Sequence, residues 1–308
     1  MATDVDTPPS TAPEAIDAVP LRHPWRWVAA VVIVILVGLF IYGAATNPLY
    51  RWPVFAKYFF NERILTGVGI TLMLTVTSMV IAIILGVILA VMRLSPNPVF
   101  TSVAWVYLWI FRGTPIYVQL AFWGLIPTIY RNIQLGVPFG PRLLEIQLTD
   151  PNYFILAMLG LALNEAAYMA EIIRAGISSV PEGQTEASTA LGMSWGMTMR
   201  RTVLPQAMRV IIPPTGNEVI SMLKTTSLVT AVPYSFDLYS IAMREIAARE
   251  FEPVPLALVA AAWYLVVTSI LMVGQYYLER YYSRGASRKL TSKQLEALAK
   301  AQMGEAHP

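Results

Sequence analysis

The feature that most constrains this sequence is a series of long apolar runs, of which the clearest is Ile64–Met92. This run holds 29 residues and no charged side chain. A helix needs roughly 20 such residues to cross the hydrocarbon core of a bilayer. Over the whole chain only 13% of the residues are charged, about half the fraction usual in soluble domains. The alternating polarity of transmembrane strands does not occur. The sequence therefore predicts an all-α, polytopic helical membrane protein.

Six runs are long enough to be spans, and two of them contain residues that interrupt helices: FRGTP at 111–115 and PPTGN at 213–217. The first run has an alternative interpretation as a cleaved signal peptide that ends near GAA, but signal peptides usually begin at the extreme N-terminus. The predicted spans are 27–45, 64–92, 99–130, 153–177, 210–232 and 253–278. The segments around them are predicted as a disordered tail (1–26), an interfacial stretch (46–63), polar loops (131–152 and 233–252) and a basic tail (279–308).

The distribution of basic residues predicts the orientation of these spans. Six crossings place both termini on one side. If that side is the cytoplasm, 13 Lys and Arg residues lie inside, 7 lie outside and 2 lie within spans, out of 22 in all. Basic residues are enriched in cytoplasmic loops, so this arrangement is favoured. It places the polar stretch between the fourth and fifth spans in the cytoplasm.

Composition excludes several kinds of chemistry. The chain has no cysteine and only two histidines, His23 and His307, both in the terminal tails. Thiolate sites, disulfides and a histidine-based metal site in the membrane are therefore not expected, and neither is a catalytic residue. The net charge of +3 is small and argues against nucleic-acid binding. No G-x-x-x-x-G-K phosphate loop occurs, so we do not expect the chain to hydrolyse ATP by that route.

The cytoplasmic stretch 181–206 is predicted to form a short helix, a break and a second short helix. Pro181 suits a helix start, Gly192 suits a C-terminal cap, Ser194 suits an N-cap, and Pro205 limits how far the second helix can run without a kink. An isolated helix of this length is not stable in water. It needs a surface to dock on, either a groove in another protein or its own chain.

This stretch resembles the EAA loop of the membrane subunits of ABC importers. That family shows Glu-Ala-Ala, then a glycine, then Leu-Pro, and here Glu186, Ala187, Gly192, Leu204 and Pro205 match. Ser188 replaces the second alanine, a change that we expect to leave the surface smooth. Further segments resemble the polar amino-acid branch of the family from about residue 64 to 278: FRGTP, LNEAAYMAEIIRAGISSVPEGQ, LPQAMRVIIPPTGNE and LKTTSLV.

The resemblance implies a non-catalytic permease subunit with a type I importer transmembrane domain of five core spans (64–278). The span at 27–45 is additional to the family pattern. The short helix would be a coupling helix that docks on a cytoplasmic ATPase dimer, which would bind the ATP and Mg. The other implied partners are a second permease subunit, an extracytoplasmic binding protein and a polar amino acid such as glutamate, glutamine, histidine or arginine, at the inner membrane of a prokaryote. The residues implied in coupling are Glu182, Gly183, Glu186, Ala187, Gly192 and Met193.

Charged and polar side chains within the spans are the candidates for a substrate path. A charge that faces lipid costs at least a few kcal/mol, so these groups are expected to face protein or water. Glu171 and Arg174 are spaced to pair with each other, and interhelical hydrogen bonds are the alternative role for Asn164, Glu165 and Tyr168. The predicted path residues are Arg112, Gly113, Thr114, Asn164, Glu165, Tyr168, Asn217, Glu218, Lys224, Thr225 and Thr226.

The interruptions FRGTP and PPTGN are predicted helix breaks at Pro115, Pro213, Pro214 and Gly216. Transporters hold substrate beside such discontinuous helices, although a kink needed only for packing is the alternative. Other functions remain open at this stage: import of an opine or a sulfur amino acid, transport driven by an ion gradient, or a scaffold without transport activity. Trp105 and Trp109 are assigned to an interfacial belt or the core.

Overall fold

The computed structural model describes residues 24–136, 142–148 and 152–282. The predictions for 1–23 and for the tail after 282 lie outside these residues. The chain divides into two compact units, residues 1–50 and 51–308. In the first unit, α1 (Pro24–Thr46) is followed by the 3₁₀ turn η1 (Pro48–Tyr50). α1 is 23 residues long and apolar enough to span a membrane, as the sequence predicts.

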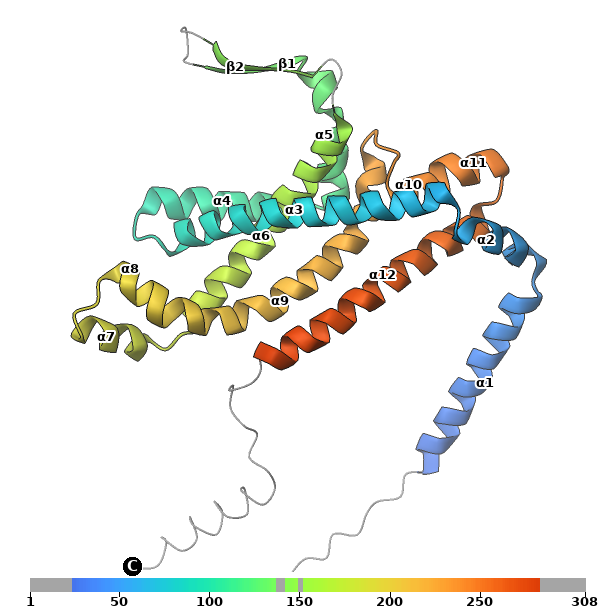
Figure 1. Ribbon diagram of the computed structural model, residues 1–308, viewed down its shortest axis with the longest axis horizontal. Coiled ribbons are helices and arrows are strands. Elements are labelled where there is room, and N and C mark those ends of the chain that lie inside the picture. The colour runs from blue at the N-terminus through green and yellow to red at the C-terminus, as the bar shows by residue number, and fades with distance from the viewer. Residues whose placement is uncertain (1–23, 137–141, 149–151, 283–308) are drawn as a thin grey trace, which may run out of the picture. The chain divides into compact units, whose positions relative to one another are not determined.

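The second unit is built almost entirely of helices (Figure 1). A two-stranded antiparallel hairpin replaces part of the polar loop expected at 131–152. The elements of the second unit, in chain order, are α2 (Trp52–Phe59), α3 (Glu62–Leu94), α4 (Pro98–Gly113), α5 (Ile116–Ile129), β1 (Asn132–Gly136), β2 (Arg142–Gln147), α6 (Tyr153–Ser178), α7 (Glu182–Ala190), α8 (Trp195–Thr198), η2 (Met199–Val203), α9 (Leu204–Thr225), η3 (Thr226–Ala231), α10 (Leu238–Ser240), η4 (Ile241–Ile246), α11 (Ala247–Glu250) and α12 (Pro253–Tyr282).

The long helix α3 is defined at its start by local chemistry and along its length by packing. Asn61 caps it, with its side-chain oxygen accepting a hydrogen bond from the backbone N–H of Arg63 at 3.0 Å, and Glu62 lies in the first turn, where the helix dipole favours an acid. Its buried face carries small residues and packs against α6. At Gly86 a Cβ atom would lie 2.6 Å from the Cβ of Met169. The absence of a side chain there therefore permits the close approach of α3 and α6.

The third predicted span is two helices. α4 ends at Gly113 and α5 begins at Ile116. The two residues between them, Thr114 and Pro115, have extended backbones. The interruption predicted at FRGTP is therefore present. Among the described residues, four helices are long and apolar enough to span a membrane by themselves: α1, α3, α6 and α12. α5 is a shorter apolar helix.

The predicted break at Pro213, Pro214 and Gly216 is wrong. α9 is continuous from Leu204 to Thr225. Side chains supply donors to the turn that contains the prolines: the Thr215 hydroxyl donates to the carbonyl of Ile211 at 2.8 Å, and the Gln275 amide of α12 donates to that of Pro213 at 2.7 Å. Neighbouring helices and hydroxyl side chains commonly make proline tolerable in membrane helices in this way. The helical geometry changes only at Thr226, where the 3₁₀ segment η3 begins.

Candidate functional site

The interruption between α4 and α5 is held in place by two amide side chains. Asn164 of α6 donates through Nδ2 to the carbonyl of Phe111 at 2.9 Å, and Gln119 of α5 donates through Nε2 to the same carbonyl, also at 2.9 Å. Gln119 also bonds both oxygens of Thr114, and Asn164 bonds Gln119 at 3.2 Å. Two backbone carbonyls at the interruption, those of Phe111 and Thr114, thereby accept hydrogen bonds from side chains. This fixes the FRGTP segment against α6.

Beside this interruption lies a pocket of about 290 Å³. α6 contributes three of its side chains and α9 contributes four, which follow one another at helical spacing on one face. The remaining lining residue is Ile116, the first residue of α5. The lining residues are Ile116, Asn164, Glu165, Tyr168, Glu218, Ser221, Met222 and Thr225.

Two acidic side chains dominate the electrostatics of this pocket. Glu165 is only 7% exposed, Glu218 is partly buried, and both line the same pocket. Oε1 of Glu165 is buried without a hydrogen-bond partner among the described residues. None of the lining side chains is basic. Like charges repel strongly where the effective dielectric constant is low, so a cation between the two acids would stabilise their ionised forms.

Five of the predicted path residues line this pocket, and the other six do not. Arg112 and Gly113 line a neighbouring pocket on the far side of Tyr168. Thr114 belongs to the interruption, where Gln119 binds it. The three on α9 and η3 lie elsewhere: Asn217 and Lys224 are exposed outside the pocket, and Thr226 is fully buried with its hydroxyl donating to the carbonyl of Leu223 at 2.6 Å.

Sequence reasoning missed three lining residues. Ser221 and Met222 follow Glu218 by three and four positions on α9, so helical spacing from that glutamate points to both of them. Ile116 carries no such signal, because it reaches the pocket only through the interruption that precedes it. The expected ion pair is confirmed: Arg174 Nη2 lies 2.8 Å from Glu171 Oε2.

The first part of the stretch after α6 has the structure that its sequence predicts. α7 begins after Pro181, and Gly192 has a φ of +75° at the turn that follows, a conformation that glycine adopts without strain. Ser194 occupies the N-cap position of α8 but makes no side-chain cap hydrogen bond. The predicted second short helix is not separate from the next span. α8 continues through the π-helical η2 into α9, and Pro205 stands in the first turn of α9, where its missing N–H costs little.

α7 presents an exposed surface beyond the end of α6 (Figure 1). Leu191 and Trp195, in and after the turn, are 82% and 73% exposed, which is unusual for large apolar side chains outside the bilayer. Of the residues implied in coupling, five are exposed and the last is partly buried: Glu182, Gly183, Glu186, Ala187, Gly192 and Met193.

Ser188 does not belong to this exposed surface. It is the buried residue of α7, and its hydroxyl lies 2.9 Å from that of Thr202 in η2 while donating to the carbonyl of Gln184 at 2.8 Å. The departure from the Glu-Ala-Ala pattern therefore joins α7 to its own chain. Because Ser188 is buried, its replacement of alanine leaves the exposed surface of α7 smooth, as the sequence predicts.

Comparison with known proteins decides the family. Residues 82–284 match the family model described as the binding-protein-dependent transport system inner membrane component. The chain belongs to this family. The match begins within α3, so α1 lies outside it.

Curated relatives of this permease handle amino acids. It is 61% identical over 294 residues to the arginine transport system permease protein ArgU of Corynebacterium glutamicum, covering 95% of this chain and 92% of ArgU. It is 38% identical over 210 residues to the histidine/lysine/arginine/ornithine transport system permease protein HisM of Escherichia coli K12, covering 67% of this chain and 83% of HisM. A solved amino acid ABC transporter with histidines has a chain that is 32% identical, with a TM-score of 0.61 and coverage of 73% of this chain and 96% of that one.

These matches establish the general role. The permease is a multi-pass inner membrane component of an amino-acid ABC transporter, with the type I transmembrane fold, and is a transport component rather than an enzyme. Membership in the family implies an ATPase and a second permease subunit as its partners.

Proposed function

We propose that this permease belongs to an ATP-driven importer of cationic amino acids, and that Glu165 and Glu218 hold the cationic side chain of the substrate. The single observation that carries this proposal is that two acidic side chains line one pocket that has no basic side chain in its wall. Two carboxyl groups brought together at membrane depth are both stable in the ionised form only when a cation lies between them. A guanidinium group provides paired donors that match carboxylate oxygens.

The relatives support this choice of substrate. Their names specify arginine in one case and histidine, lysine, arginine and ornithine in another. The pocket also offers hydroxyl groups of Ser221 and Thr225 beside the two acids. These neutral groups suit the uncharged polar parts of an amino acid.

The source of energy would be the partner ATPase, which would bind ATP and Mg, with α7 as the point of contact. The exposed face of α7 and the apolar side chains of Leu191 and Trp195 suit docking into a cleft of another protein. This arrangement requires α7 to lie in the cytoplasm, with both termini on the same side. An extracytoplasmic binding protein would deliver the substrate. Nucleotide binding would then shift the equilibrium between inward-open and outward-open states of the paired permease subunits.

Transport by the purified complete complex in liposomes tests the substrate site. We expect Glu165→Gln and Glu218→Gln each to lower ATP-dependent arginine uptake by about tenfold or more, since loss of one charge-assisted pair costs about 1.5–3 kcal/mol. Glu250→Gln, a change at an exposed residue of α11, is the matched control and should leave uptake unchanged. Citrulline, the neutral analogue of arginine, should be transported poorly by the unmodified complex.

Each outcome bears on the proposal. Normal arginine uptake in both glutamine variants would remove the pocket from the substrate path. Uptake that continues after ATP depletion while an ion gradient is maintained would replace the ATPase mechanism with an ion-driven one. Equal transport of arginine and citrulline would overturn the assignment to cationic amino acids.

A further inference from the structure

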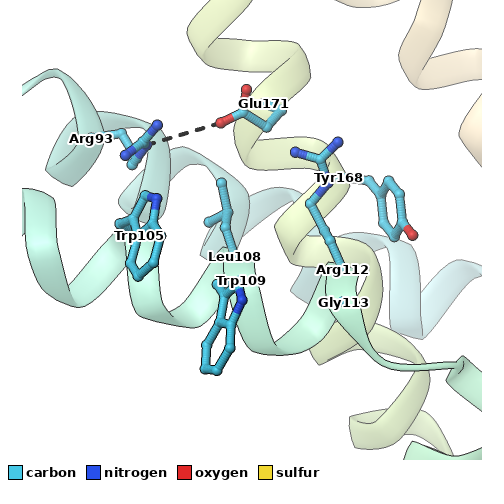
Figure 2. Close-up of a pocket in the computed structure, with 8 residues that line it drawn as sticks. All are labelled: Arg93, Trp105, Leu108, Trp109, Arg112, Gly113, Tyr168 and Glu171. Carbon is cyan, nitrogen blue, oxygen red and sulfur yellow. Dashed lines mark ion pairs between the residues drawn. The ribbon is translucent and has the colours of Figure 1, made fainter.

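A second pocket, of about 490 Å³, lies next to the substrate pocket and shares only Tyr168 with it. It is formed by the C-terminal end of α3, one face of α4 and the C-terminal half of α6 (Figure 2). The function proposed above does not use it. Its lining residues are Arg93, Trp105, Leu108, Trp109, Arg112, Gly113, Tyr168 and Glu171.

Positive charge exceeds negative charge around this pocket. The carboxylate of Glu171 is shared by three arginines: Arg174 at 2.8 Å, Arg93 at 4.0 Å through Nε, and Arg112 through a longer electrostatic interaction. Arg112 also lies over the ring of Tyr168, at 5.4 Å from its centroid. Over the described part of the chain, no other carboxylate forms an ion pair with these arginines. The cluster therefore retains uncompensated positive charge.

One donor in the cluster has no acceptor. Nε of Arg93 is buried and lacks a hydrogen-bond partner within the described residues, because 4.0 Å from Glu171 is too long for a hydrogen bond. A buried donor without a partner costs about 1–3 kcal/mol. An anion in the pocket would supply both the missing acceptor and the missing negative charge.

The position of the pocket indicates where such an anion comes from. Arg93 precedes Leu94, the last residue of α3, and α4 begins at Pro98, so the pocket opens close to a membrane boundary, on the side where α6 leads to α7. Trp105 and Trp109 stand on its rim, 53% and 64% exposed, with parallel rings whose centroids lie 6.2 Å apart. Exposed tryptophans are enriched at the level of lipid headgroups. Arg112 starts deeper on α4, but its side chain turns toward Tyr168 and Glu171 (Figure 2).

We propose that this pocket binds the phosphate-bearing headgroup of an anionic phospholipid in the leaflet on the α7 side of the membrane. The guanidinium groups of Arg93 and Arg112 hold the phosphate by charge-assisted hydrogen bonds, and the indoles of Trp105 and Trp109 pack against the glycerol and the start of the acyl chains. Basic pockets between transmembrane helices bind anionic headgroups in this way. The lipid neutralises positive charge that Glu171 alone does not balance at the edge of the hydrocarbon region.

Quenching of tryptophan fluorescence by brominated lipids tests the proposal on the complete complex in nanodiscs. The signal of Trp105 and Trp109 is obtained by difference from the double variant Trp105→Phe/Trp109→Phe. We expect phosphatidylglycerol with brominated acyl chains to quench this signal at about one tenth of the mole fraction that brominated phosphatidylcholine requires. Arg93→Gln/Arg112→Gln should abolish this preference. Arg209→Gln removes an exposed arginine of α9 outside the pocket and should preserve it.

Four results would overturn the proposal. The first is equal quenching of the unmodified complex by the two lipids, which would mean that a partner subunit covers the pocket or that it is empty; this measurement needs no arginine variant to fold. The second is an equal loss of preference in Arg209→Gln, which would indicate general surface charge. The third is loss of preference in the charge-retaining variant Arg93→Lys/Arg112→Lys together with normal assembly. The fourth is full competition by soluble glycerol phosphate, which would identify a free phosphate ligand instead of a lipid.

Discussion

The amide of Asn164 on α6 and the backbone carbonyl of Phe111 on α4 are joined by a hydrogen bond of 2.9 Å. This contact connects residues 53 positions apart in the sequence. It fixes the point where the helical hydrogen bonds of α4 stop, and Gln119 completes the arrangement from α5. Asn164 therefore does two things: it lines the acidic pocket, and it holds the wall next to that pocket.

Replacement of Asn164 by leucine tests this second role. We expect Asn164→Leu to lower substrate transport by roughly tenfold while the complex stays assembled, because Gln119 loses a buried partner at a cost of about 1–3 kcal/mol. ATP-dependent uptake and co-purification of the ATPase are the measurements. Asn217→Leu changes an exposed amide of α9 outside the pocket and should transport normally. Equal uptake by the two variants would contradict the positioning role.

The turn after α7 gives a prediction about ATPase docking. At Gly192, a φ of +75° disfavours most side chains, and an added side chain would project into open space on the proposed docking surface. We expect Gly192→Arg to abolish co-purification with the ATPase while the permease remains in the membrane. Gly192→Asn separates the two causes, because asparagine tolerates this backbone conformation and is small, so docking should largely survive. Unchanged docking in Gly192→Arg would remove α7 from the interface.

Ser188 gives a prediction about the rigidity of the same segment. Ser188→Ala restores the Glu-Ala-Ala pattern but removes the hydroxyl contact with Thr202, so we expect a stability loss of about 1 kcal/mol with nearly normal substrate-stimulated ATPase activity. Ser188→Leu places a large side chain in a buried position and should uncouple α7 from η2. Its ATPase activity should then no longer respond to substrate. A normal response in Ser188→Leu would show that transmission does not require this contact.

The sequence was sufficient for features that depend on local chemistry. Run lengths predicted the four helices that are long and apolar enough to span a membrane, Pro115 predicted the interruption in the third predicted span, and Gly192 predicted the turn after α7. It was insufficient where distant side chains decide. Pro213 and Pro214 read as a helix break because the donor from Gln275, 62 positions away, is not visible in the local pattern.

The candidate site shows the same division between local and distant effects. Asn164, Glu165 and Tyr168, which the sequence predicts as path residues on the fourth span, line one pocket. Lys224 and Thr226 are predicted as path residues because they are polar. In the structure Lys224 is exposed outside the pocket, and Thr226 is buried in the 3₁₀ segment that follows α9. The inward orientation of Ser188 likewise depends on Thr202, which the α7 sequence does not reveal.

Two glycines of α3 give a matched test of the helix packing that supports the site. A Cβ at Gly86 would lie 2.6 Å from the Cβ of Met169 and 3.2 Å from the backbone of Ala170, whereas a Cβ at Gly69 would have no neighbour within 4 Å. We expect Gly86→Ala to destabilise the protein by about 1–3 kcal/mol, because α3 and α6 must separate. Gly69→Ala should be neutral or stabilising by up to about 1 kcal/mol, since alanine favours the helix. Thermal unfolding of the purified complex, followed by fluorescence, measures both. Because Met169 follows Tyr168 directly, Gly86→Ala should also weaken arginine binding at the acidic pocket, which Gly69→Ala should leave intact. Equal melting temperatures for the two variants would show that the α3–α6 contact is looser than this geometry requires.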